Sequence, residues 1–296
     1  MTNLEALFVA LASLSYFLST ALWLYVIIFR VLLNKERAEE TSPALWMIRI
    51  VVLGFAFHTA AIAVRWATSG HPPVMGLYEN AILGSWFIII LYLLGLKKFA
   101  SNFILTGGAV IPFSLLLIGW GLLERPRLAP LSPPFQSNWL WIHVGFAWLA
   151  FGSYIISAAL GIAYLIKERI AGSATSEQGG EDSSRGYLSS PDIKKLDELI
   201  LAFVAFGFVS QGFMIASGAI WAADLWGSYW SWDPVETWSL IAWLVYAVFL
   251  HFRLVVGWRG RKCAILTIIS LVAIIIAFFG VGAINTMHTM ILGAGE

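Results

Sequence analysis

The chain has 296 residues, of which 59% are hydrophobic and only 12% are charged. Soluble domains carry about 25% charged residues, and the mean hydropathy here is +0.82. Apolar runs of about 18 residues or more recur along the chain, which is the pattern of membrane-spanning helices and excludes a soluble enzyme. The net charge of +1 gives no indication of nucleic-acid binding.

Segments of about 20 apolar residues can cross a bilayer, and the sequence contains about eight of them. They are residues 5–32, 44–67, 77–96, 102–122, 139–166, 197–220, 239–258 and 264–285. The pattern predicts an all-α integral membrane protein with a single polytopic domain over residues 1–296. No basic residue precedes the first apolar run, so we expect this segment to stay as a helix and not to be cleaved as a signal.

Lysine and arginine are distributed unevenly between the two sides of the predicted bundle. All but three of the 18 lie near the connections that follow the first, third, fifth and seventh spans. The exceptions are Arg65, Arg125 and Arg127. Because cytoplasmic connections carry an excess of basic residues, we expect both termini on the periplasmic or lumenal side. Residues 168–196 are rich in Ser, Gly and acidic residues, and we expect a flexible cytoplasmic linker there, with Pro191 and Asp192 opening a short helix that leads into the next span.

A tryptophan-rich segment, residues 221–238, joins the sixth and seventh spans on the outer side. Its core is WGSYWSWDPVETW, which contains Trp226, Trp230, Trp232 and Trp238. An aromatic belt at the membrane interface explains one or two tryptophans at each helix end, but not this density. A shelf of indole rings favours a large planar ligand, and porphyrin is the obvious one for a membrane protein that also has suitably placed histidines.

The acidic residues of this segment have a structural explanation as well. Asp233, Pro234 and Glu236 match an N-cap, a first helical residue and a capping-box glutamate at the start of the seventh span. This role does not exclude contact between Asp233 and a ligand.

Two histidines are expected at the depth of the tryptophan-rich segment. His143 lies in NWLWIHVGFAW near the outer end of span five, and His288 lies in VGAINTMHTM just beyond span eight. Two neutral imidazoles beside an aromatic shelf could supply both axial ligands of a haem iron. Each could instead be an interfacial histidine bonded to backbone or water.

The remaining histidines are His58, His71 and His251. His58 and His251 lie within spans, where ionisable residues are costly and commonly functional. They could form a second, intramembrane bis-histidine site, or each could make a hydrogen bond between helices. His71 lies in an outer loop, where holding the loop and touching a ligand are equally good explanations. The single cysteine, Cys263, excludes an internal disulfide, a CxxC pair and a CxxCH haem attachment site.

These segments resemble a known family. WGSYWSWDPVETW resembles the WWD motif of the haem-handling proteins of cytochrome c maturation, and within that group the chain is similar to the CcsA/ResC family. RWATSGHPPVMGLYEN, WIHV, FLHFR and the C-terminal NTMH resemble further family motifs in the same order. VMG stands where that family usually has SDL or SNL.

The resemblance implies roles for individual residues. His143 and His288 would be the external axial ligands of haem b under the tryptophan shelf. His251 would be a transmembrane ligand that holds haem on its way outward, and its partner histidine would come from another subunit or from His58. Implied partners are a ResB/CcsB-type membrane subunit, an apocytochrome c with its CxxCH segment, and an external thiol reductant. The membrane would be the plasma (inner) or the thylakoid membrane.

The function expected from this resemblance is haem transport and covalent haem attachment, as the membrane half of a holocytochrome c synthase (haem lyase). Two other functions remain open at this point. A haem exporter would hand its cargo to a chaperone without attaching it. A b-type cytochrome subunit would pass electrons between haems, but it requires histidines deep on facing helices. A non-haem solute transporter would leave the tryptophans unexplained.

Overall fold

A computed structural model of the chain describes residues 1–26, 42–99, 105–124, 128, 130–176 and 193–281. This part is helical, with no strand among the residues described. The α-helices are α1 (Asn3–Val26), α2 (Ser42–Ser69), α3 (Gly76–Phe99), α4 (Gly107–Gly121), α5 (Asn138–Ser176), α6 (Ile193–Trp226), α7 (Pro234–Leu254) and α8 (Arg261–Ile275). A short 3-10 helix, η3 (Pro133–Phe135), precedes α5, and a π-helical segment, η4 (Ile276–Gly280), continues α8.

Seven of the described helices are long and apolar enough to cross a bilayer. The chain is therefore a multi-pass integral membrane protein, as the sequence predicts. The exception is α4, whose 15 residues extend only about 22 Å at 1.5 Å per residue, less than the ~30 Å hydrocarbon core of a bilayer. It begins at Gly107, five residues after the predicted start of the span, and Pro112 lies inside it.

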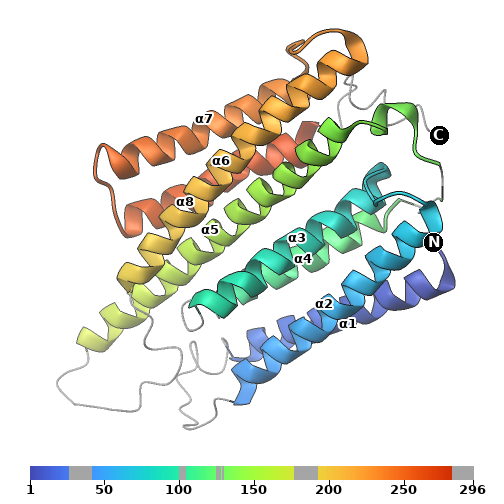
Figure 1. Cartoon of the computed structure of the whole chain (residues 1–296). Helices are drawn as coiled ribbons and strands as arrows, with labels where there is room; N and C mark the ends of the chain where they lie inside the picture. The colour runs from blue at the N-terminus through green and yellow to red at the C-terminus, as the bar shows by residue number, and fades with distance from the viewer. Residues whose placement is uncertain (27–41, 100–104, 125–127, 129, 177–192, 282–296) are drawn as a thin grey trace.

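Neighbouring helices in the chain pack mainly as antiparallel pairs (Figure 1). The pair α1–α2 lies at one side of the bundle, α3–α4 lies next to it, and α5, α6, α7 and α8 form the other half. The central helix is α5, which contacts α3, α4, α6 and α8. Its Phe151 and Tyr154 are completely buried, so the principal core lies where the two halves of the bundle meet.

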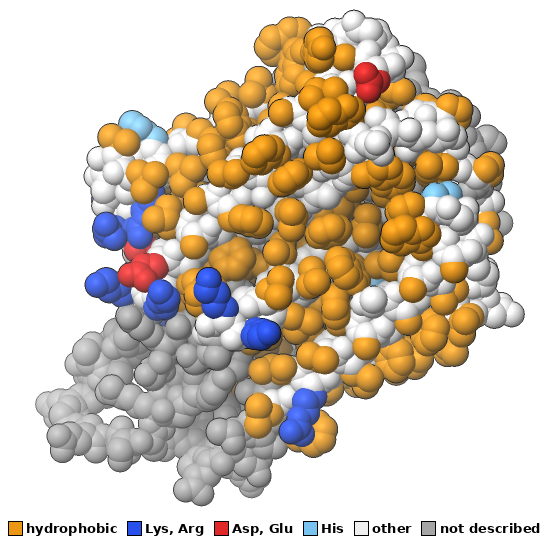
Figure 2. Space-filling view, viewed as in Figure 1, with side chains coloured by type: hydrophobic (Ala, Val, Ile, Leu, Met, Phe, Trp, Pro, Cys, Tyr) orange, Lys and Arg blue, Asp and Glu red, His pale blue; other side chains and the backbone are white. Residues whose placement is uncertain are grey.

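The two ends of the bundle differ in charge. Basic residues lie at the end where α3 and α7 finish and where α6 and α8 begin, and they include Lys97, Lys98, Lys194, Lys195 and Arg261. Figure 2 shows Lys and Arg side chains gathered at that end of the visible face, beside a broad hydrophobic surface. The start of α1 and the loop between α6 and α7 lie at the opposite end (Figure 1).

The structure describes only the two ends of the predicted linker. α5 continues to Ser176 and α6 begins at Ile193, so both ends of the 168–196 segment are helical. Residues 177–192, which include Pro191 and Asp192, lie outside the described residues. The helix expected before span six is the first part of α6 itself, which runs without a break to Trp226.

Candidate functional site: an aromatic cavity at one end of the bundle

A cavity of about 930 Å³ lies at the end of the bundle where α6 and α7 are joined. Residues from α3, α5, α6 and α7 form its walls, together with residues from the ends of α4 and α8. Its aromatic lining consists of Trp120, Trp148, Trp221, Tyr229, Trp230, Phe278 and Phe279. The volume and apolar lining are those of a site for a ligand of considerable size.

His143 lies in the wall of this cavity on α5. Its Nδ1 is 2.9 Å from the carbonyl oxygen of Met214 on α6. A carbonyl only accepts, so Nδ1 must donate its proton, and the lone pair of the neutral ring is then on Nε2. A backbone carbonyl that fixes the tautomer in this way is the usual companion of a metal-ligating histidine. The arrangement suits His143 to coordinate iron through Nε2.

The tryptophan-rich segment contributes unequally to the cavity. Trp221, in the last part of α6, lines it, and its ring centroid is 6.2 Å from that of His143. The Trp221 indole also donates to the carbonyl of Pro134 in η3, at 3.0 Å. Trp230 lines the cavity, whereas Trp226 and Trp238 do not. The shelf expected from the sequence is therefore built chiefly from Trp221, Trp230 and Tyr229.

Trp232 has an unusual backbone conformation. Its φ of 60° makes it the one non-glycine residue with positive φ in the described part of the chain. Such a conformation costs about 1–3 kcal/mol for a bulky residue and persists where surrounding structure imposes it, commonly at functional sites. The Trp232 side chain is 69% exposed and meets Trp230 edge to face at 5.7 Å. It lies outside the cavity, on its outer edge.

The acidic residues of the motif hold the backbone, as predicted. Asp233 is the N-cap of α7 and accepts a hydrogen bond from the N–H of Val235 at 2.9 Å. Glu236 differs from a capping-box glutamate, because it reaches past the cap to the N–H and hydroxyl of Ser231, at 2.8 and 3.2 Å. Both carboxylates are buried. Glu236 also lines the cavity, whereas Asp233 does not.

Part of the cavity wall comes from residues that the motif does not contain. The carboxylate of Glu124, after α4, accepts the N–H groups of Leu77 and Tyr78 at 2.6 and 3.2 Å. It therefore caps the start of α3 from another part of the chain. Gly76, Leu77 and Asn80 line the cavity beside it. They belong to the GLYEN stretch that resembles the family, but Glu124 has no recognisable motif around it.

A buried ion pair also stabilises the region around the start of α3. Arg65 on α2 contacts Glu79 at 2.7 Å, and its guanidinium is 3.7 Å from Glu5 on α1. The Tyr78 hydroxyl donates to Glu5 at 2.8 Å. All three ionic groups are almost completely buried, so they hold α1, α2 and the start of α3 together where α3 meets the cavity.

Aromatic and polar contacts close the inner end of the cavity. Phe278 and Phe279 belong to η4, and their ring centroids lie 4.6 and 5.6 Å from the ring centroid of Phe151. Gln211 bridges to the Tyr154 hydroxyl at 2.8 Å and to the Ser239 carbonyl at 3.0 Å. π-Helical turns are frequent at functional sites, and η4 is the point at which α8 turns two aromatic rings toward the cavity.

The histidines within spans are not brought together. His58 is 1% exposed, among α1, α2 and α3, and its Nδ1 is 3.3 Å from the Tyr16 hydroxyl. His251 is exposed in the last turn of α7, on the other side of the bundle (Figure 1). The interpretation that His58 and His251 together form one intramembrane bis-histidine site is therefore wrong. His251 is also farther from the start of its helix than expected, because α7 begins at Pro234 and not near residue 239.

His71 and His288 complete the set. His71 is buried in the α2–α3 loop, where its Nδ1 lies 2.9 Å from the Pro72 carbonyl and its backbone carbonyl accepts a hydrogen bond from the Ser69 hydroxyl. These contacts support the loop-holding explanation. His288 lies outside the described residues, so its expected place opposite His143 stays a prediction. Within the described part, no three His, Cys, Asp or Glu side chains are grouped to hold a metal ion.

The fold and the cavity define a multi-pass membrane protein with an aromatic binding site at one end. The sequence model of the family described as "Cytochrome C assembly protein" matches residues 74–288, and the chain belongs to this family. The matched region begins immediately before the cavity-lining residues of α3 and includes every helix from there onward. The protein has a role in cytochrome c maturation, in the plasma or thylakoid membrane.

Individual relatives agree with this assignment. "Cytochrome c biogenesis protein CcsA" of Synechococcus sp. (strain CC9902) is 31% identical over 268 residues, which cover 84% of this chain and 86% of that protein. The protein of the same description from Guillardia theta is 31% identical and covers 94% of this chain and 91% of its own. The one from Mesostigma viride is 33% identical, with 79% and 83% covered.

One solved structure shares the fold. "Cytochrome c Heme Lyase CcmF" superposes with a TM-score of 0.62 at 18% sequence identity, covering 100% of this chain and 52% of that chain. The chain thus spans about half the length of this structural neighbour.

Proposed function

We propose that the cavity binds haem b as a substrate and that the protein presents it for covalent attachment to apocytochrome c. The observation that carries this proposal is the His143–Met214 hydrogen bond in the wall of a 930 Å³ aromatic cavity. It gives an iron-ligating tautomer next to indole rings that can bury a porphyrin face. The family's place in cytochrome c maturation and the name of the structural neighbour support the same ligand.

In this proposal His143 and His288 are the two axial ligands of the iron, and Trp221 and Trp230 cover part of the porphyrin. Tyr229 and Trp232, 66% and 69% exposed, form the edge at which an apocytochrome CxxCH segment docks. Each thiol S–H adds across one haem vinyl group, forming one C–S and one C–H bond with no net oxidation. The protein supplies binding and orientation, and the cysteines and the haem supply the chemistry.

The thiols must arrive reduced, and the chain's own cysteine cannot maintain them. Cys263 is buried near the opposite end of the bundle, where its thiol contacts the Trp258 carbonyl. We therefore propose a separate external thiol reductant. A ResB/CcsB-type subunit would complete the synthase, and the termini would lie on the periplasmic or lumenal side. His251, exposed on α7, would hold haem on its way outward with a ligand from that subunit.

An electron-transfer subunit of the b-type cytochrome class is less well supported. That function needs paired histidines deep in the bundle, and His58 and His251 lie on different sides of it. A haem exporter uses the same cavity and differs only in the last step. Covalent haem on a co-expressed c-type apocytochrome, in a host without its own maturation genes, supports attachment over export.

The direct test is the visible spectrum of the purified chain, co-expressed with its partner subunit. We expect a reduced low-spin b-type spectrum that weakens in His143→Ala and recovers in part with added imidazole. The control is His71→Ala, which removes a loop histidine outside the cavity and should leave the spectrum unchanged. Absence of haem from the wild-type complex, or a spectrum indifferent to His143→Ala, would remove the basis of the proposal.

A further inference from the structure

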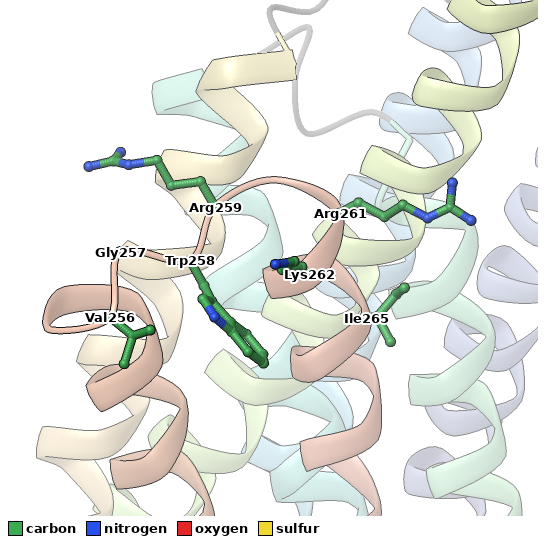
Figure 3. Close-up of a pocket in the computed structure, with 7 residues that line it drawn as sticks. All are labelled: Val256, Gly257, Trp258, Arg259, Arg261, Lys262 and Ile265. Carbon is green, nitrogen blue, oxygen red and sulfur yellow. The ribbon is translucent and has the colours of Figure 1, made fainter.

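A second recess lies at the opposite end of the molecule, in the loop between α7 and α8. It has a volume of about 780 Å³ and is lined by Val256, Gly257, Trp258, Arg259, Arg261, Lys262 and Ile265. Figure 3 shows Arg259 and Arg261 extending to opposite sides of the loop, with Lys262 between them. Lys262 lies over the Trp258 indole at 5.4 Å. All three cations are exposed.

The loop that carries these cations is held rigidly from below. Asp197 on α6 pairs with Arg253 at 2.7 Å and accepts the N–H of Gly260 at 2.7 Å. Arg253 donates to the Trp258 carbonyl at 3.0 Å. Gly257 and Gly260 adopt left-handed conformations, with φ of 80° and 63°. The recess is therefore a preformed structure and not a chance gathering of mobile side chains.

Among the residues that the structure describes, negative charges near this surface are few. The one described ion pair of the three cations joins Arg261 to Glu168 on α5 at 3.6 Å, with the Arg261 side chain 70% exposed. Asp197 is buried and already paired with Arg253. Within the described residues no side chain caps the first turn of α8, so the positive end of the helix dipole adds to the positive field.

The surface below the cations is aliphatic. Val255 is 73% exposed and Val256 is 52% exposed, and Ile265 and Ile269 on α8 are 40% and 61% exposed. On membrane helices such side chains face lipid acyl chains. A ligand that complements both the cations and the aliphatic surface has a negatively charged headgroup and hydrocarbon chains. Clusters of Lys and Arg at the cytoplasmic end of membrane spans bind lipids of this kind.

We propose that the α7–α8 recess binds the phosphate headgroup of an anionic phospholipid. The phosphate contacts Lys262 and one of the two arginines, Trp258 lies at the headgroup level, and the acyl chains follow Val256, Ile265 and Ile269. This site is independent of the haem cavity and of the function proposed for it.

The test uses the full chain, purified in detergent and stripped of lipid, with phosphatidylglycerol and phosphatidylcholine as probes. Native mass spectrometry counts bound lipid, and the unfolding temperature reports stabilisation. The wild type should bind phosphatidylglycerol at least about tenfold more tightly than the triple variant Arg259→Gln, Arg261→Gln, Lys262→Gln. Phosphatidylcholine should bind both equally weakly.

A matched control keeps the comparison specific. Lys97→Gln with Lys98→Gln removes two cations from the same end of the bundle, in the last turn of α3, and should retain wild-type phosphatidylglycerol affinity. Equal affinity of the wild type and the triple variant would overturn the proposal, as would an equal loss in the α3 control.

Two competition experiments identify the source of the charge. Inorganic phosphate should fail to displace the lipid at matched concentration, since it has no acyl chains; efficient displacement would overturn a lipid site in favour of a soluble phosphate. Haemin should also leave the bound lipid in place. If haemin displaces it and needs the same three cations, the recess belongs to the porphyrin and the lipid proposal fails.

Discussion

Gly218 lies so close to His143 that a Cβ placed on it would be 2.6 Å from Nδ1. The glycine on α6 is what lets the ring approach the Met214 carbonyl from α5. The absence of a side chain at Gly218 therefore permits the orientation of the imidazole that we propose as the iron ligand.

Gly218→Ala should displace the His143 ring and lower haem occupancy about tenfold or more, the usual effect of disturbing a ligand's supporting contact. The measurement is the ratio of Soret to protein absorbance in the purified complex. The matched control is Gly212→Ala on the same helix, where an added Cβ would be 3.6 Å from the Trp243 ring, an ordinary contact. Equal haem content in both variants would show that the position of the ring does not matter.

Arg65→Met should destabilise the protein by about 3–5 kcal/mol, because it leaves Glu5 and Glu79 buried without their cation. The readouts are the unfolding temperature in detergent and the amount of protein in the membrane. Arg49→Met is the comparison, since Arg49 is exposed and lies over the ring of Trp46. It should change stability by less than about 0.5 kcal/mol.

Glu124→Ala should weaken the start of α3 by about 1–2 kcal/mol, because the N–H groups of Leu77 and Tyr78 lose their acceptor. Glu124→Gln keeps an acceptor oxygen and should lose less. Hydrogen exchange at the first turn of α3 measures the effect locally. Identical exchange in the wild type and Glu124→Ala would mean that other groups cap this turn.

Trp232→Gly separates strain from function. Glycine adopts the φ of 60° without steric conflict, so we expect an unfolding free energy higher by about 1 kcal/mol. The yield of covalent cytochrome should nevertheless fall, because the exposed indole at the docking edge is lost. A full yield from this variant would remove Trp232 from the proposed docking surface.

The proposed orientation predicts that the α6–α7 loop is accessible from the periplasmic or lumenal side and the α7–α8 loop from the cytoplasmic side. In a Cys263→Ser background, which has no other cysteine, Ser228→Cys should react with a membrane-impermeant maleimide in intact cells or spheroplasts. Arg259→Cys should react only after permeabilisation. The reverse pattern would place the aromatic cavity on the cytoplasmic side.

Much of the fold could be predicted from hydropathy, because a span depends on a composition summed over some 20 residues. Helix boundaries depend on single residues, and the observed boundaries differ from the predicted ones. α7 begins at Pro234 because Asp233 caps it there, and α4 begins at Gly107, five residues after the predicted start of the span.

The site was only partly predictable for a related reason. His143 and Trp230 stand out by residue type and by motif, and the structure places both in the cavity wall. Phe278 and Glu124 also line it, but nothing in their local sequence distinguishes them from ordinary core or loop residues. The separation of His58 from His251 depends on which helices pack together, which span depth alone cannot indicate.

Beneath the cavity, the rings of Tyr154 and Tyr246 lie face to face with centroids 3.5 Å apart, and Gln211 ties Tyr154 to the wall above. Rings in van der Waals contact leave no passage for a flat macrocycle between α5 and α7 at this level. Within the described residues, this pair of rings therefore closes the cavity toward the interior of the bundle. Under the proposed function, a porphyrin that comes from the opposite end of the bundle would pass along its outside, past the exposed His251 on α7, and would enter the cavity from its side or its open end.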